Sequence, residues 1–246
     1  MGAAALWIIR QPVDDYIAAL SVFARGWDWR RLATLVAAAC LAWWLYVPVH
    51  ELAHAFGCLL GGGSVSRLDI DPAYGAALLQ RVFPFVNVGS EYAGQLTGFD
   101  TRGSDLTYLL TDFLPFAGTI LLGVPLLHGA RQLGRRPLLQ AAVFGASLPV
   151  ALAPFVSLTG DYYEMGSILV SRLSAWLTPG FTVTRWRSDD LFKLAGQLFG
   201  SDGGGTIGDA VGLAASFVLG VVLAFLTYAA GSLWARVLLS AKGTRA

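Results

Sequence analysis

Charged residues are scarce in this sequence: only 13% of its 246 residues are Asp, Glu, Lys or Arg, whereas 55% are hydrophobic. A soluble globular domain usually carries about twice this share of charge, so the deficit argues against a soluble fold. No basic block of the kind that follows a phosphate backbone is present, which argues against nucleic acid as a partner. The mean hydropathy of +0.60 indicates instead a protein whose surroundings are a lipid bilayer.

Cysteine is also rare. The two cysteines, Cys40 and Cys58, both lie in apolar stretches, and we expect them to be small buried hydrophobic residues rather than a disulfide or a redox site. Residues 1–31 lack the long apolar core and the small-residue cleavage site of a signal peptide. Their apolar positions recur at helical spacing, which predicts an accessory amphipathic helix on the membrane surface.

Long uncharged runs are the main positive signal. Each of the runs is about long enough to cross a bilayer as a helix. Three contain no charged residue, namely 32–49, 137–160 and 210–235, and a fourth, 106–130, contains only Asp112. The sequence therefore predicts an all-α, polytopic bundle of about four to five transmembrane helices, as in a multi-pass protein of a prokaryotic-type cell membrane.

The segments between these runs predict smaller elements. The alternation in residues 65–70 is typical of a strand, and Asp71-Pro72 and Gly75 are typical of turns, so we expect a short membrane-associated β-hairpin there. Residues 165–177 are an apolar stretch too short for an easy separate crossing, and their role stays open. The expected division is an amphipathic segment (1–31), a transmembrane core (32–178), an extramembrane loop (179–209) and a last transmembrane helix with its tail (210–246).

One pentapeptide carries the chemistry: His50-Glu51-Leu52-Ala53-His54, at the end of the first apolar run. On a helix, residues four apart share a face, so His50 and His54 can offer two nitrogens to one metal ion, with Glu51 beside them as general base. The chain has only three histidines and three glutamates, which makes a chance match a poor explanation. Ionisable groups at membrane depth are also costly unless they have partners. The pattern predicts a catalytic Zn²⁺ site.

Zinc needs a third protein ligand. Asp161 is favoured because it follows a 24-residue uncharged run and a glycine that lets the backbone approach closely. Glu164 lies three residues further on and would share a helical face with Asp161, so it is the second choice for the ligand or a group that holds the ligand. Two other acids remain candidates, Asp112 and Glu91, whereas the remaining histidine, His128, is not expected to bind the metal.

These residues resemble the site-2 protease family of intramembrane metalloproteases. The resemblance covers about residues 32–177 and rests on the segment Val49–Phe56, the glycine-rich bend and strand after it, and Gly160-Asp161 in a later membrane helix. It implies that zinc is held by the HExxH histidines and a distant Asp. It also implies that the substrate is a transmembrane protein whose helix unwinds locally so that water can attack its peptide bond.

The sequence departs from the family pattern at two places. The family's LDG motif is absent, because Asp161 lies between Gly160 and Tyr162, and the Asn-x-x-Pro upstream of it is replaced by residues 153–156, Ala-Pro-Phe-Val. We hypothesise that the single asparagine of the chain, Asn87, contacts the substrate backbone or the oxyanion. The simpler interpretation is that Asn87 is a turn residue beside Gly89.

Two other functions stay open. A membrane zinc protease of the prenyl-protein type would use Glu164 as ligand, but the acid expected four residues later is replaced by Ile168. A non-catalytic metal-binding scaffold or chaperone would not need Glu51, since metal binding alone does not require it.

The orientation in the membrane also has two interpretations. Arginines precede the first span and follow the second (Arg25, Arg30, Arg31, Arg131, Arg135 and Arg136), and the positive-inside rule would place the HELAH end on the non-cytoplasmic side. The resemblance implies an active site that opens to the cytosol.

Overall fold

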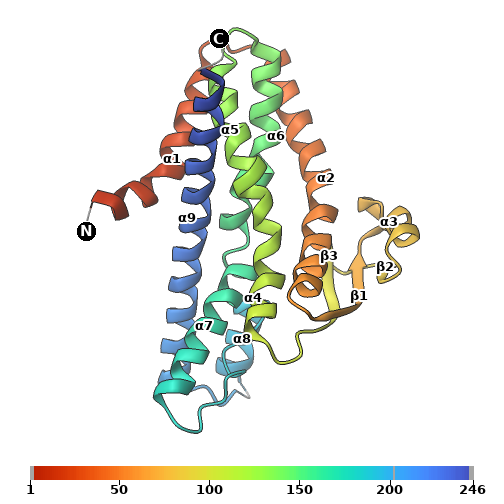
Figure 1. Cartoon of the computed structure of the whole chain (residues 1–246), viewed down its shortest axis with the longest axis vertical. Helices are drawn as coiled ribbons and strands as arrows, with labels where there is room; N and C mark the ends of the chain where they lie inside the picture. Colours follow the sequence, from red (N-terminus) through yellow and green to blue (C-terminus); the bar gives the residue numbers. More distant parts are fainter. Residues whose placement is uncertain (1–2, 202, 244–246) are drawn as a thin grey trace.

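The computed structural model describes residues 3–201 and 203–243. The chain is mostly helical and forms an elongated bundle with a small sheet attached to one side (Figure 1). Four helical segments are long and apolar enough to cross a membrane: Trp29–Leu60, Asp105–Gln132, Pro137–Leu177 and Ile207–Ser240. The structure thus agrees with the predicted helical, membrane-type architecture.

Helix α1 (Ala3–Ala24) packs against α5 (Val124–Gln132) and α9 (Ile207–Gly243). Its outer face exposes Val13 and Ile17 together with the charged Arg10 and Asp14, whereas Gln11 and Asp15 are buried against the bundle. Polar side chains therefore lie on both faces of α1, and the buried Asp15 finds its hydrogen-bond partners within the bundle. His128 and Arg131 on α5 both contact its carboxylate.

Helix α2 (Trp29–Leu60) carries the HELAH motif in its last third. It begins at Asp28, whose side chain accepts a hydrogen bond from the backbone nitrogen of Arg31 at 2.8 Å, an N-cap contact. It ends at Gly61, and the next residue, Gly62, has φ = 85°, a conformation that favours glycine. The glycine-rich break predicted after the motif is present.

The sheet has three strands, β1 (Ser64–Ile70), β2 (Val86–Val88) and β3 (Gly94–Asp100), in the order β2-β1-β3. β1 pairs antiparallel with β3 and parallel with β2. The predicted two-stranded hairpin is thus replaced by a mixed sheet, because residues 71–85 form the 3-10 turn η1 (Pro72–Tyr74) and helix α3 (Ala76–Val82) and then return as β2. Leu68 and Ile70 pack on Leu52 and Ala55 of the HELAH turns.

The two middle spans are interrupted helices. The second consists of α4 (Asp105–Phe113), the short 3-10 helix η2 (Leu114–Phe116), the π-helical segment η3 (Thr119–Gly123), and α5. The third consists of α6 (Pro137–Val156) and α7 (Asp161–Leu177), with a break at residues 157–160. Residues 165–177 therefore continue the third span as part of α7. The segment predicted as a loop at 179–209 contains a further helix, α8 (Leu191–Phe199).

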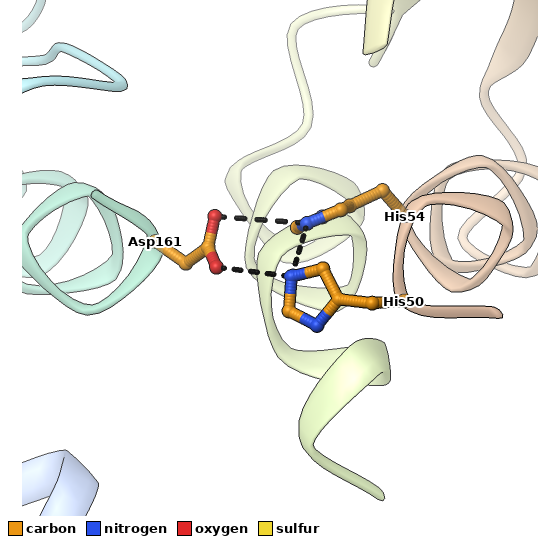
Figure 2. Close-up of side chains that lie close together, drawn as sticks. All are labelled: His50, His54 and Asp161. Atoms are coloured by element: carbon orange, nitrogen blue, oxygen red, sulfur yellow. Dashed lines mark hydrogen bonds and ion pairs between the residues drawn. The ribbon is translucent and has the colours of Figure 1, made fainter. Parts of the chain in front are cut away.

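The packing places α4 between α2 and α7. α2 packs on α6 and α4, while α7 packs on α9 and on the opposite side of α4. Figure 2 shows α4 between the other two helices.

Of the two cysteines, Cys58 is buried near the end of α2, as expected. Cys40 is exposed, so the expectation of burial is wrong for Cys40.

Candidate metal centre

Three side chains from two helices converge at the break in the third span (Figure 2). His50 and His54 project from α2, and Asp161 is the first residue of α7. The two Nε2 atoms are 3.2 Å apart, and each lies close to one carboxylate oxygen of Asp161, at 3.5 Å from His50 and 3.6 Å from His54. Within the described residues this is the one group of at least three His, Cys, Asp or Glu side chains close enough to hold a metal ion.

These separations fit a tetrahedral zinc site. Zinc bonds to nitrogen and oxygen are about 2.0–2.1 Å long, so two ligands of a tetrahedral ion lie about 3.3 Å apart. The distances of 3.2, 3.5 and 3.6 Å among the three ligand atoms are close to this value. Three protein ligands would leave the fourth position open, as in catalytic zinc sites.

A hydrogen bond on the far side of the ring fixes the tautomer of His54. Its Nδ1 lies 2.9 Å from the backbone carbonyl oxygen of Thr111 on α4. A carbonyl can only accept, so Nδ1 carries the hydrogen and Nε2 presents its lone pair to the space between the three side chains, where a metal ion could bind. The ring of His50 has a similar support, because its Nδ1 lies 3.1 Å from the hydroxyl of Tyr46, one helical turn earlier.

The Thr111 carbonyl is brought to His54 by a close approach between α2 and α4. A Cβ atom added to Gly57 would lie 2.2 Å from the carbonyl oxygen of Leu110, so only glycine allows the two backbones to pack this closely. One turn further on, the hydroxyl of Thr107 donates to the carbonyl of Gly61 at 2.7 Å. Gly57 is the signal in the sequence that could have indicated this contact, and the sequence prediction missed it.

A cluster of aromatic rings in edge-to-face and tilted contact joins α2 to α7. Phe116 is fully buried in η2, and its ring centroid lies 5.5 Å from that of His50 and 4.5 Å from that of Tyr162. Because Tyr162 follows Asp161 directly, this cluster holds the start of α7 against the histidine face of α2. Asp161 also lies in the first turn of α7, where the positive end of the helix dipole favours a carboxylate.

Glu51 lies beneath the start of strand β3. A Cβ atom added to Gly94 would lie 2.4 Å from Cγ of Glu51, so the strand backbone passes directly over this side chain. β3 pairs with β1 on one side only, and its other edge has no strand partner within the described residues. The general base predicted from the sequence thus lies against the first residue of β3.

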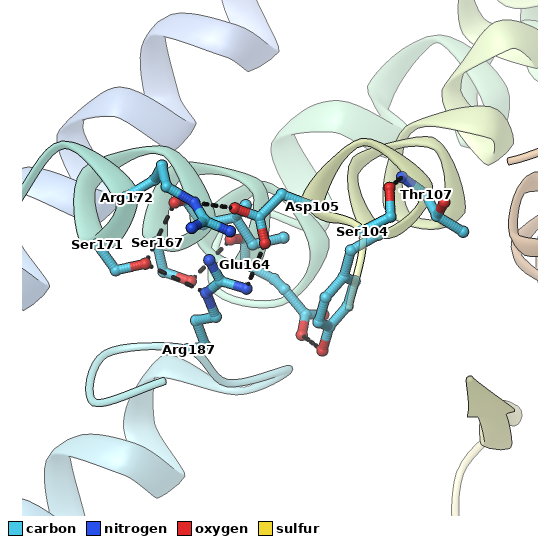
Figure 3. Close-up of polar contacts among 10 residues, drawn as sticks. Ser104, Asp105, Thr107, Glu164, Ser167, Ser171, Arg172 and Arg187 are labelled. Carbon is cyan, nitrogen blue, oxygen red and sulfur yellow. Dashed lines mark hydrogen bonds and ion pairs between the residues drawn. The ribbon is translucent and has the colours of Figure 1, made fainter. Parts of the chain in front are cut away.

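His50, His54 and Asp161 are called the triad from here on. Glu164 lies in a different polar network from the triad. The hydroxyl of Tyr108 on α4 donates to its carboxylate. Close by, Asp105 is paired with Arg172 of α7 and Arg187 of the following loop, and these contacts join α4 to α7 (Figure 3). The second-choice ligand therefore faces the contact between α4 and α7.

The other candidate acids are not part of the triad. Asp112 is buried in α4, and its Oδ2 atom has no hydrogen-bond partner within the described residues. Glu91 is exposed between β2 and β3. His128 lies 2.8 Å from the carboxylate of Asp15, so it belongs to the contact between α1 and α5.

Asn87 lies in β2, in register with Asp69 of β1. The sheet order separates β2 from β3 by the whole of β1, so the strand that passes over Glu51 is not the strand that carries Asn87. The structure does not bring Asn87 to the triad.

A comparison of the chain with protein-family models, with curated proteins and with solved structures found no match in any of the three.

Proposed function

We propose that this chain is an intramembrane zinc metalloprotease of the site-2 protease type, which hydrolyses peptide bonds of membrane-spanning substrates. The observation that carries the proposal is the convergence of His50, His54 and Asp161 at tetrahedral spacing, with Glu51 on the same helix turn. The presence of Glu51 between the two histidines supports catalysis over simple metal storage, because metal binding does not need this glutamate.

The chemistry divides between the metal and the chain. Zinc, when bound, supplies a Lewis acid that polarises a carbonyl and lowers the pKa of a coordinated water to about 7. Glu51 takes the proton from the attacking water and passes it to the leaving amine. Thr111 and Tyr46 keep the two imidazoles oriented while this happens.

The free edge of β3 supports an extended substrate. A transmembrane helix satisfies its own backbone hydrogen bonds, so its peptide bonds must be unwound before water can reach them. An unwound segment exposes N–H and C=O groups, and a free strand edge can pair with them. Because β3 starts over Glu51, a peptide paired with this edge would run past the general base.

The two alternatives have less support. A ligand set with Glu164 is disfavoured because its carboxylate accepts a hydrogen bond from Tyr108 and faces the α4–α7 contact. A non-catalytic scaffold would not require strand β3 to approach Glu51 so closely that only glycine fits at position 94.

The test is a comparison of cells that express the wild-type chain with cells that express Glu51→Gln. Membrane peptides cut only by the wild type identify substrates, and the inactive variant should retain the same proteins uncut when it is purified. Each substrate is then incubated with both purified proteins in lipid nanodiscs. Equal cleavage by the wild type and by Glu51→Gln would sink the proposal.

A further inference from the structure

Exposed arginines gather at the end of the bundle remote from the triad. α2 rises about 30 Å between its first turn and the HELAH motif, since a helix rises about 1.5 Å per residue. At the upper end of Figure 1, the turn between α1 and α2 and the loop between α5 and α6 lie together. We call this surface the basic end, and its four exposed arginines are Arg25, Arg30, Arg135 and Arg136.

Direct contacts bring the two segments together. Arg31 donates one hydrogen bond to the carbonyl oxygen of Gly26 and another, of 3.0 Å, to the side-chain oxygen of Gln140 on α6. A Cβ atom added to Gly134 would lie 3.5 Å from the side chain of Val22 on α1. The four exposed arginines therefore belong to one surface formed by four helix ends, those of α1, α2, α5 and α6.

The positive charge of the basic end is not neutralised by acids. None of its four arginines forms an ion pair within the described residues. Arg31 is buried and its side chain bonds only neutral oxygens, so it adds a further unpaired charge. Asp28 is the single acid in residues 25–31 and 133–137, and its side chain caps α2. Asp15 is already paired with Arg131 and His128.

Two tryptophans indicate how deep the basic end lies in the bilayer. Trp27 and Trp29 are 64% and 72% exposed and lie between the arginines in the same turn. Exposed tryptophans at the ends of apolar helices mark the headgroup level of a bilayer. The arginines are therefore placed among lipid headgroups.

We propose that the basic end is a binding surface for anionic phospholipid headgroups. Guanidinium groups bind phosphate oxygens through paired N–H donors, and arginines near an anionic bilayer surface attract it strongly. A soluble acidic protein is a poorer fit, because the two tryptophans hold this surface at the level of the lipids. The inference does not depend on the proposed protease activity.

The test uses the full-length protein in mixed micelles of detergent and phosphatidylcholine, titrated with phosphatidylglycerol. Bound lipid is counted by native mass spectrometry, and the melting temperature is measured in parallel. For the wild type, phosphatidylglycerol should be retained and should raise the melting temperature. The triple variant R30Q/R135Q/R136Q should bind it about tenfold or more weakly, since each arginine contributes several-fold to the attraction.

A matched control removes three exposed positive charges that lie outside the basic end. The variant R81Q/R102Q/K193Q changes the net charge equally and should bind phosphatidylglycerol like the wild type. If R30Q/R135Q/R136Q does not fold in phosphatidylcholine, the single variant Arg136→Gln takes its place, with an expected loss of about fivefold. Equal retention of phosphatidylcholine, an equal effect of inorganic phosphate, or unchanged binding in the variants would overturn the proposal.

Discussion

His54 and Thr111 are 57 positions apart in the chain, yet Nδ1 of His54 donates a 2.9 Å hydrogen bond to the backbone carbonyl of Thr111. The acceptor is a backbone atom of α4, so it cannot be removed by changing one side chain. It orients the ring so that Nε2 faces Asp161. His50 has the weaker support of the two, a single hydroxyl on its own helix.

Removing that hydroxyl gives the first prediction. Tyr46→Phe deletes the group 3.1 Å from Nδ1 of His50 and should weaken zinc binding by about 10- to 100-fold, the usual cost of losing an orienting partner of a metal ligand. Competition with a zinc chelator measures the affinity. Tyr92→Phe, which changes an exposed tyrosine, is the matched control and should bind like the wild type. Identical affinities for both variants would contradict the orienting role of Tyr46.

Gly94 gives a prediction that separates catalysis from metal binding. The methyl group of Gly94→Ala would lie 2.4 Å from Cγ of Glu51, so either the glutamate or strand β3 must move. Cleavage of an identified substrate should fall at least tenfold, because a general base typically contributes about 10²–10⁴-fold, while zinc content should stay the same. Gly129→Ala, at a helical glycine with open space, controls for the substitution itself. Full activity in Gly94→Ala would show that the strand does not constrain Glu51.

The sequence predicts the triad better than it predicts the surroundings of the triad. His50, Glu51 and His54 are local on one helix, and Asp161 is marked by its place after a long uncharged run. The structure brings the two histidines and Asp161 together. The contacts of Thr111, Phe116 and Gly94 with these residues depend on how separate segments pack, and a single sequence contains no direct record of such packing.

Asp15 gives a prediction about stability. Its buried carboxylate accepts hydrogen bonds from α1, α5 and α9, through Gln11, His128, Arg131, Tyr228 and Ser232. Asp15→Ala leaves these donors without their acceptor and should cost about 3–5 kcal/mol, which thermal unfolding would measure. Zinc content should not change.

The neighbouring Asp14 is the control for this experiment. It is exposed and makes only a long, 3.9 Å ion pair with Arg10, so Asp14→Ala should change stability by less than about 1 kcal/mol. Equal losses of stability for the two alanine variants would argue against a special role of Asp15.

Asp69 gives a pH-dependent prediction for the sheet. Burial raises the pKa of Asp69, but hydrogen bonds from Thr97 and Arg67 and the charge of Arg67 outweigh it, so the pKa lies below its usual value. A lowered folded-state pKa stabilises the protein above the unfolded pKa of about 3.9, and this stability is lost as the pH falls through the folded value.

Hydrogen exchange of the β1 and β3 amides in the wild type and in Asp69→Asn measures this effect. At pH 6 the wild type should be better protected, and the difference between the two proteins should shrink toward pH 3. A difference that stays constant across this range would show that the charge of Asp69 does not stabilise the sheet.

The predicted fold differs from the structure where strands pair with segments that are distant in the sequence. The runs of apolar residues indicate the helices, and the three glycines after Leu60 indicate the end of α2. The sheet is different, because β1 takes a partner from residues 94–100 across the intervening helix α3 and strand β2. Alternation of apolar residues predicts a strand but not its partner, and the expected hairpin was therefore too simple.

The zinc-to-protein ratio of three purified proteins tests the central claim most directly. We expect about one zinc ion per chain in the wild type, about one in Glu164→Ala, and almost none in Asp161→Ala, because Asp161 is the acid among the described residues whose carboxylate faces both histidines. Full zinc occupancy in Asp161→Ala, or loss of zinc in a folded Glu164→Ala protein, would contradict it.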